Sequence, residues 1–251
     1  MYIINPKLAG KPMFLTIIIP VWNEVAKITD DVKAIIKFVK EVDYQIELII
    51  VDDGSKDNTA QIAEKVSVPD SLTYRVFSYS PHRGKGYAVR KGISESSGEY
   101  VMFMDSGRNV PVKFIGSGLR LIEENDYDIL NGSRYLPDSI ITKRLIWYRQ
   151  ITSTLFRNFV KKYLKLPSFI TDTQCGFKFF RGDVIRKLGK ICKSDGFIFD
   201  LELILLALEK EYLICEFPIE WTCDRDSRLS LIRSLIPILS DLKKLKTRFN
   251  K

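Results

Sequence analysis

FLTIIIPVWNE, residues 14–24, carries the strongest structural signal in the chain. Its first six residues are aliphatic, aromatic or β-branched, which predicts a strand covered on both faces, as in a parallel α/β sheet. Pro20 has no N–H to donate, so we expect it to end the strand. Parallel sheets bind ligands beyond the carboxyl ends of their strands, and Trp22 and Glu24 follow at that end. This stretch therefore predicts both a buried strand and the edge of a binding site.

The pattern of a strand followed by a helix repeats along the first half of the chain. Apolar residues recur at helical spacing from Ile28 to Val42, with Thr29 or Asp30 expected as the N-cap. Further strands are expected at 46–51, 72–79, 100–104 and 212–216, and further helices from about 59, at 87–94 and at 199–209. Alternating strands and helices predict right-handed βαβ units. The expected fold class is therefore α/β, with a mostly parallel sheet flanked by helices.

We expect three parts in the chain. Residues 1–13 form a short leader, residues 14–227 the main domain, and residues 228–251 a basic amphipathic helix in which Pro237 should produce a kink. Within the main domain, residues 143–165 contain seven basic and no acidic side chains, interleaved with aromatic ones. This pattern is typical of an amphipathic helix at a membrane interface, or of a solvated basic face above a core stripe.

Composition narrows the classes of function. Among 251 residues the net charge is +8, which suits nucleic acid, anionic lipid or a phosphorylated substrate as a partner. The four cysteines form no CxxC pair and His82 is the only histidine, which argues against a zinc site and means that any Ser-His-Asp or Cys-His group would have to include His82. The sequence has no signal-peptide pattern, and no apolar run approaches the ~20 residues of a membrane span.

Three further strand ends carry polar residues. Asp52 and Asp53 can accept hydrogen bonds from a nucleobase or a ribose, although Asp-Gly is also an ordinary turn. Lys85 lies within a Gly-Lys-Gly string that can place N–H groups and an ammonium near phosphate, or can simply form a strand-to-helix turn. Asp105 suits Mg²⁺ or Mn²⁺ as an oxygen ligand, and a helix-capping role is the alternative. Together with Glu24, these residues favour a nucleotide-sugar site.

Six sequence strings, taken in order and with their spacings, resemble a known family. They span about residues 14–230 and read IIIPVWNE, VDDGSKDNT, RGKGYAVRKG, FMDSG, NGSRY and DTQCGFKFF. The set resembles the inverting GT-A glycosyltransferases of the polyprenyl-phosphate sugar synthase kind. Within that group it is most similar to the dolichyl-phosphate β-glucosyltransferases and next to the dolichyl-phosphate mannose synthases. The resemblance implies a Rossmann-like GT-A fold that binds a nucleoside diphosphate sugar.

The resemblance also implies roles for individual residues. The nucleotide-binding positions would be Pro20, Trp22, Glu24, Val51, Asp53, Lys85 and Ser106. The positions facing the phosphates and the sugar, and so expected to act in catalysis, would be Asp105, Arg134, Asp172, Gln174 and Arg228. Asp105 matches the first Asp of a metal-binding DxD, which implies Mg²⁺ or Mn²⁺ as the cofactor. Gly107 replaces the second Asp, and Asn109 is the expected compensating ligand.

These inferences lead to one main hypothesis. The chain is expected to be a hexosyltransferase that transfers glucose from UDP-glucose, with inversion, to a polyprenyl or dolichyl phosphate. The second pKa of a phosphate monoester is about 6, so this acceptor is mostly dianionic at pH 7 and needs no general base. The enzyme would be a peripheral, monotopic protein at the cytoplasmic face of a membrane, without a nucleic-acid partner and with its oligomeric state left open.

Two alternatives stay open at this point. The first is sugar transfer to a hydroxyl group of a non-lipid acceptor, which needs a base, and Asp172 is the motif carboxylate available for that role. The second is a nucleotide-sugar-binding subunit without catalysis. The absence of the second DxD carboxylate at Gly107 favours this second alternative.

Overall fold

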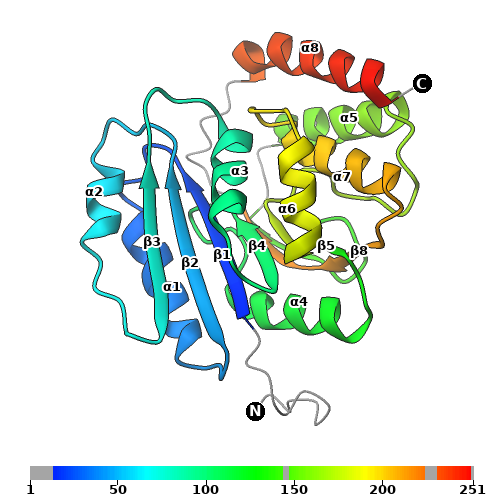
Figure 1. Ribbon diagram of the computed structural model, residues 1–251. Helices are drawn as coiled ribbons and strands as arrows, with labels where there is room; N and C mark the ends of the chain where they lie inside the picture. The colour runs from blue at the N-terminus through cyan, green and yellow to red at the C-terminus, as the bar shows by residue number, and fades with distance from the viewer. Residues whose placement is uncertain (1–13, 144–146, 224–230, 250–251) are drawn as a thin grey trace.

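Strands and helices alternate along the computed structural model, which describes residues 14–143, 147–223 and 231–249 (Figure 1). The strands are β1 (Phe14–Val21), β2 (Gln45–Asp52), β3 (Leu72–Ser78), β4 (Tyr100–Met104), β5 (Ile129–Ser133), β6 (Ile140–Lys143), β7 (Phe177–Arg181), β8 (Ile214–Pro218) and β9 (Glu220–Thr222). The helices are α1 (Ile28–Val39), α2 (Thr59–Glu64), α3 (Lys85–Glu95), α4 (Lys113–Glu124), α5 (Trp147–Tyr163), α6 (Gly182–Ile191), α7 (Phe199–Glu209) and α8 (Leu231–Phe249). The leader expected at 1–13 lies outside the described residues, and a domain boundary after residue 227 stays a prediction.

The main sheet has the strand order β3-β2-β1-β4-β7-β5-β8, and β6 pairs with β9 in a separate sheet. β1 is parallel to β2 and β4, β2 is parallel to β3, and β5 is parallel to β8. β7 is antiparallel to both of its neighbours, β4 and β5. The mostly parallel α/β sheet is therefore confirmed. Because β7 runs the other way, its first residue, Phe177, lies opposite Met104 at the end of β4, which brings the preceding loop to the carboxyl edge of the sheet.

β1 continues two residues further than the sequence suggested. Pro20 lies within the strand opposite Val51 of β2, so the expectation that it ends the strand is wrong. The Val21 carbonyl accepts a hydrogen bond from Asp53 N (2.9 Å), which shows that the Val21 backbone faces β2. Neighbouring residues of a strand direct their backbone groups to opposite sides, so the missing N–H of Pro20 faces β4, whose pairing with β1 ends at Ile18. The proline therefore removes no hydrogen bond from the ladder.

The start of α1 also differs from the expectation. Its N-cap is Lys27, without a side-chain capping bond, and not Thr29 or Asp30. The carbonyl of Glu24 accepts hydrogen bonds from the backbone N–H groups of Lys27 (2.9 Å) and Ile28 (3.0 Å), so the first turn forms earlier. Asp30 consequently lies inside the first turn, where a carboxylate favours the positive end of the helix dipole.

The two faces of the sheet are covered by different helices, as the alternation of side chains along a strand requires. Leu15, Ile17 and Ile19 of β1 belong to the core that includes α1 and α4. Ile18 belongs to the core that includes α3, α6 and α7. Figure 1 shows α3 and α6 in front of the sheet and α1 behind it. The strand ends between these layers are therefore the part of the sheet that is open to a ligand.

α5 and α8 pack around α7 as an additional layer (Figure 1). Leu201 and Leu205 of α7 lie in one buried cluster with Val160 of α5 and Leu242 of α8. The helix expected within 143–165 is confirmed as α5, and the basic C-terminal helix is confirmed as α8. Within the ranges that the structure describes, no helix is both long and apolar enough to span a bilayer.

Candidate active site

The carboxyl ends of β1, β2 and β4 lie at one edge of the sheet, because these strands are parallel. Asp53 and Asp105 follow the ends of β2 and β4, and contacts of the segment before α3 join them. Gly84 N donates a hydrogen bond to Asp53 Oδ2 (2.8 Å), and the next residue, Lys85, forms an ion pair with Asp105 (Nζ to Oδ1, 2.5 Å). Two of the strand ends singled out by the sequence are therefore connected through the Gly-Lys-Gly string.

The Asp53 carboxylate is bound on both oxygens by the loop that follows β3. Oδ1 accepts hydrogen bonds from Tyr79 Oη (2.9 Å) and Arg83 N (2.7 Å), and Oδ2 accepts the bond from Gly84 N. Burial raises the pKa of Tyr79, and its hydrogen bond to Asp53 raises it further, so the hydroxyl stays a donor. Asp53 is only 2% exposed. It therefore organises the loop, and its contact with a nucleotide stays a prediction.

His82 completes this corner of the site, a role that the motifs did not indicate. Its Nδ1 atom lies 2.9 Å from Asp53 Oδ2 and 3.1 Å from the carbonyl oxygen of Asp53. Its ring stacks on Trp22, with ring centroids 4.3 Å apart and an angle of 26° between the planes. The signal available in the sequence was its position two residues before the Gly-Lys-Gly string.

Asp105 lies between Lys85 and the loop that precedes β7. Asp105 N donates a hydrogen bond to Gly176 O (2.9 Å), and a Cβ atom on Gly176 would lie 2.2 Å from the Asp105 carboxylate. Burial lowers the pKa of Lys85, but the nearby carboxylates of Asp105 and Asp200 outweigh burial and raise it above its ordinary value. Lys85 therefore holds a positive charge beside Asp105, where the family resemblance implies a diphosphate.

The loop after Asp105 explains why glycine stands at the second DxD position. Gly107 has a φ of 94°, a conformation that residues with a Cβ rarely adopt. Asp31 of α1 accepts hydrogen bonds from Ser106 Oγ (2.6 Å) and Gly107 N (3.0 Å). Burial raises the pKa of Asp31, and these two hydrogen bonds oppose the shift. The Ser106 hydroxyl, expected at the nucleotide, is thus directed to Asp31.

Arg134 and Asp172 form a bidentate ion pair. Arg134 Nε and Nη2 lie 2.7 and 2.9 Å from the two carboxylate oxygens of Asp172. Burial raises the pKa of Asp172, but the guanidinium of Arg134 outweighs burial and holds it below its ordinary value. Glu216 of β8 fixes the loop by accepting hydrogen bonds from the backbone N–H groups of Thr171 (2.9 Å) and Asp172 (3.0 Å). Asp172 therefore anchors Arg134 instead of standing free.

Two buried charged residues next to this cluster were missed at the level of sequence. Lys178 of β7 and Asp200 of α7 are 1% and 2% exposed, and Lys178 Nζ lies 3.7 Å from Asp200 Oδ1. Burial raises the pKa of Asp200 to about 6, although the charges of Lys178 and Lys85 oppose the shift. Asp200 Oδ1 has no hydrogen-bond partner among the described residues. The signal available in the sequence was Asp200 itself, an acidic residue near the start of the apolar string FDLELILLAL. Acidic side chains are rarely buried unless they are paired, so this one pointed to a buried partner.

The other sequence-predicted residues differ in their burial and in their contacts. Val51 is fully buried in the core beneath α3, so only its backbone could meet a nucleotide. Glu24 forms an ion pair with Lys27 (3.0 Å). Gln174 lies in the loop before β7, where its backbone N–H donates to an Asp172 oxygen (3.3 Å). Pro20, as described above, belongs to β1.

Arg228, expected to face the phosphates, lies outside the described residues. The structure therefore connects Asp53, Lys85 and Asp105 through direct contacts. Asp172 lies on the loop before β7, whose last residue, Gly176, accepts a hydrogen bond from Asp105 N, and its partner Arg134 directly follows β5.

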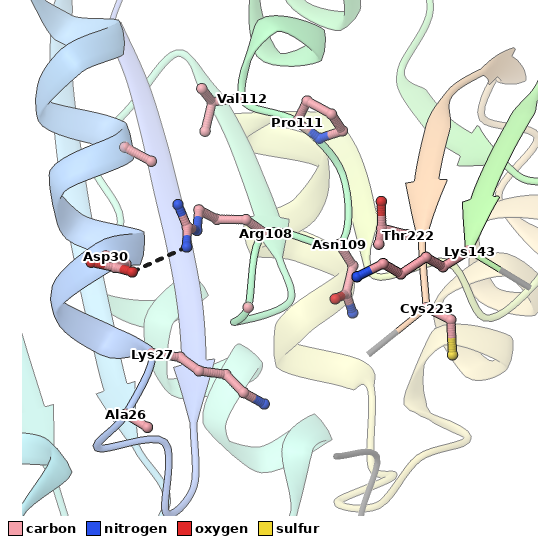
Figure 2. Close-up of a pocket in the computed structure, with 12 residues that line it drawn as sticks. Ala26, Lys27, Asp30, Arg108, Asn109, Pro111, Val112, Lys143, Thr222 and Cys223 are labelled. Atoms are coloured by element: carbon pink, nitrogen blue, oxygen red, sulfur yellow. Dashed lines mark hydrogen bonds and ion pairs between the residues drawn. The ribbon is translucent and has the colours of Figure 1, made fainter. Parts of the chain in front are cut away.

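A cleft of about 650 Å³ opens beside the loop that follows Asp105, between α1 and the ends of β6 and β9 (Figure 2). Its charged lining residues are Lys27, Asp30, Arg108 and Lys143. Asp30 and Arg108 form an ion pair across it (3.1 Å). Asn109, the expected second metal ligand, lines this cleft and also shares a smaller pocket with Asp105. The role of Asn109 as a metal ligand stays a prediction.

The donor groups suit a divalent cation that arrives with a diphosphate. In the described part of the chain, no three His, Cys, Asp or Glu side chains form a metal-binding group. Asp105 and Asn109 offer oxygen atoms, which are the donors that Mg²⁺ and Mn²⁺ prefer. Magnesium in nucleotide enzymes is commonly held by one or two carboxylates together with substrate phosphates. The Asp105 side chain is 37% exposed, so it is accessible for this kind of binding.

Comparison with protein families identifies the chain. The family described as "Glycosyl transferase family 2" matches residues 16–189, which is more than half of the sequence. The chain belongs to glycosyl transferase family 2. The family resemblance inferred from the six motif strings is therefore confirmed.

Relatives of this family member are similar over nearly its whole length. The dolichyl-phosphate beta-glucosyltransferase of Dictyostelium discoideum is 31% identical over 247 residues, which cover 94% of this chain and 75% of the relative. The protein of the same name from Saccharomyces cerevisiae is 32% identical over 255 residues, covering 95% and 76%. The human protein of that name is 28% identical over 247 residues, covering 94% and 75%.

The fold of this glycosyltransferase is similar to solved structures. Glucosyl-3-phosphoglycerate synthase from Mycobacterium tuberculosis, in complex with Mn²⁺, UDP and glucosyl-3-phosphoglycerate, superposes with a TM-score of 0.68 at 18% identity. The match covers 96% of this chain and 81% of that chain. At this level of identity the likeness concerns the fold, and it confirms the GT-A architecture expected from the motifs.

Proposed function

We propose that this glycosyltransferase transfers glucose from UDP-glucose to a dolichyl or other polyprenyl phosphate, with inversion at the anomeric carbon. Relatives at 31% and 32% identity carry the name dolichyl-phosphate beta-glucosyltransferase, which supports the sugar and the acceptor. A solved structure with the same fold is a complex with UDP, which supports the class of donor. The chain would then act as a hexosyltransferase.

The observation that carries this proposal is the state of the carboxylates at the site. Transfer to a hydroxyl acceptor needs a general base, and Asp172 was the motif candidate for it. Asp172 is 1% exposed and already bound by Arg134, which holds its pKa below the ordinary value although burial alone would raise it. A carboxylate in this state is a poor proton acceptor. A dianionic phosphate monoester needs no such base.

Asp200 does not change this conclusion. Burial raises its pKa to about 6, which would suit a base, but it is 2% exposed and faces the ammonium of Lys178. A general base must reach the proton that it removes, directly or through one water. Asp200 lies beneath the surface that an acceptor would contact, so it fits a supporting role better than contact with a substrate.

The charged residues of the chain would position the donor. Lys85 and Arg134 are cationic groups near the expected place of the leaving diphosphate, where fixed positive charge favours the transition state. Asp105, together with Asn109, would hold a divalent cation. When bound, that cation would neutralise charge on the leaving diphosphate. Attack by the acceptor phosphate from the side opposite the leaving group would convert an α-linked donor into a β-linked product.

α5 supports a lipid acceptor and a peripheral position at a membrane surface, for which we propose the cytoplasmic face. Ile151, Leu155 and Phe159 are four residues apart, so they lie on one side of the helix, and they are 52%, 63% and 46% exposed. An exposed apolar stripe on a helix with basic residues is typical of an interfacial helix. Arg157 of the same helix lies 3.5 Å from the ring centre of Tyr135, which directly follows the GSR string. α5 thus joins the apolar surface to the site.

Product analysis tests the proposed reaction. The protein is incubated with UDP-glucose and Mn²⁺, with either dolichyl phosphate in detergent or 3-phosphoglycerate as the acceptor. Mass spectrometry should detect glucosyl phosphodolichol in the first mixture and no glucosylated product in the second, and NMR should show a β-linkage. Transfer only to 3-phosphoglycerate would refute the lipid acceptor. UDP-glucose binding without transfer to either acceptor would support the non-catalytic alternative.

Sedimentation with liposomes tests the role of α5. The double variant Ile151→Ser and Leu155→Ser should sediment less than the wild type with vesicles that contain anionic lipid, because it removes the centre of the apolar stripe. Asn158→Ser changes an exposed polar position on the same helix and serves as the matched control. Equal sedimentation of the double variant and the wild type would contradict the proposed interface.

A further inference from the structure

The His82 ring makes the contacts that a nucleobase would be expected to make. The motif resemblance assigns Trp22 and Asp53 to the base and ribose of the donor. In the structure the imidazole stacks on Trp22 (4.3 Å between centroids) and its Nδ1 atom lies 2.9 Å from Asp53 Oδ2. Proteins bind unpaired bases in these same two ways, by stacking on an aromatic face and by hydrogen bonds to the edge of the base. The His82 side chain therefore occupies both contacts expected for the base, the stacking position on Trp22 and the hydrogen bond to Asp53.

The hydrogen-bond partners of His82 Nδ1 indicate the kind of base that the ring resembles. Both oxygen atoms near Nδ1, the Asp53 carboxylate at 2.9 Å and the Asp53 carbonyl at 3.1 Å, are acceptors, so Nδ1 must carry a hydrogen atom. The ring thus presents an N–H group to a carboxylate. Uracil presents an N–H group at N3 in the same manner. Cytosine has a lone pair at N3, which would face the carboxylate oxygen unfavourably.

The geometry points to His82 as a displaceable occupant of the nucleobase slot, so that a uracil nucleotide binds only when the imidazole leaves Trp22 and Asp53. This inference rests on the proposed function, because it takes the donor to be a uridine diphosphate sugar. The His82 side chain is 45% exposed, so the ring has solvent into which it can turn.

Asp53 is held in place when His82 leaves. Tyr79 Oη, Arg83 N and Gly84 N donate three further hydrogen bonds to its carboxylate. Displacement of His82 therefore exposes an acceptor that is already oriented. Only molecules with an open slot bind the nucleotide. The apparent affinity therefore equals the intrinsic affinity multiplied by the fraction of molecules in which the slot is open.

Calorimetric titration with UDP in the presence of Mn²⁺ tests this inference. His82→Ala should bind UDP about fivefold more tightly than the wild type, because one stacking contact and one hydrogen bond no longer compete. His82→Asn, which cannot stack in the same way, is the second variant and should also bind more tightly. Tyr79→Phe is the matched control, since it removes a donor from the same Asp53 carboxylate without opening the slot, and it should not tighten binding.

The outcomes separate this inference from the proposed function. Unchanged or weaker UDP binding by both His82 variants, with clear binding by the wild type, would overturn the displacement and leave the proposed function standing. Tighter binding of CDP than of UDP by the wild type would also overturn it, because the slot would then not prefer a ring N–H. A wild type that binds no nucleotide would overturn both.

Discussion

The position of the Asp105 carboxylate can be tested by adding one methyl group, in the variant Gly176→Ala. A Cβ atom at residue 176 would lie 2.2 Å from Asp105 Cγ and Oδ2, whereas ordinary contacts begin at 3.4 Å. The carboxylate must therefore retreat by about 1.2 Å, the difference between these two distances. Gly176 has no positive φ, so the methyl group and not backbone strain is the perturbation. The displacement also changes the position of the Asp105 carboxylate relative to Lys85 Nζ, which lies 2.5 Å from Oδ1 in the wild type.

We expect Gly176→Ala to lower kcat for glucosyl transfer about 100-fold, because a misplacement of about 1 Å in a catalytic constellation has an effect of that size. Overpacking lowers the free energy of unfolding by about 1–3 kcal/mol, and the lower end applies here because the partly exposed Asp105 side chain can rotate. Activity is measured at saturating substrates and stability by urea unfolding.

Gly116→Ala is the matched control for this variant. A Cβ atom at residue 116 of α4 would meet only Phe38 Cε2, at 3.9 Å. This variant should keep full activity and gain about 0.5–1 kcal/mol of stability, because alanine favours a helix over glycine. A folded Gly176→Ala protein with a kcat within threefold of the wild type would refute the placement of Asp105 at the reaction centre.

Three further outcomes follow from the charges of the site. Burial raises the pKa of Asp200 from 3.8 to about 6, so its contribution to stability is complete below pH 3.8 and is lost as the pH rises through 6. Urea unfolding from pH 4 to 7 should therefore show a decline in the free energy of unfolding that is about 2 kcal/mol larger in the wild type than in Asp200→Asn. Asp172→Asn should lower the free energy of unfolding by about 3 kcal/mol, because Arg134 loses a buried partner, while Asp183→Asn, in an exposed ion pair, should change it little. Mn²⁺ should tighten UDP binding more than tenfold in the wild type, measured by calorimetry with and without EDTA, and a similar effect in Asp105→Asn would exclude Asp105 as a ligand.

The parts of the fold that follow from local pattern were predictable, and those that depend on distant partners were not. The apolar run at 100–104 and the helix at 199–209 have the bounds expected from their composition. Periodicity carries no information about strand direction, so the antiparallel β7 could not be derived. α4 and α6 contain glycines that reduce helix propensity, and they form because their apolar faces pack on the sheet.

In the candidate site, too, some residues were predictable from local sequence patterns and others depended on distant partners. The motifs indicated Asp105 and Arg134, which the structure places in ion pairs. They did not indicate Asp31, Asp200 or Glu216, whose contacts bring together segments far apart in the chain. Such partners have ordinary local surroundings in the sequence, and they become informative only when packing shows what they touch.

The charge balance of the site explains why a metal and a diphosphate should bind together. Three ion pairs lie at its centre: Lys85 with Asp105, Arg134 with Asp172, and Lys178 with Asp200. The last two pairs hold almost fully buried carboxylates, so they cannot separate without leaving a charge buried and unpaired. The Asp105 side chain is 37% exposed, and this pair is therefore the one that can open. A divalent cation on Asp105 would release the Lys85 ammonium toward the diphosphate, so each ligand would make the other easier to bind.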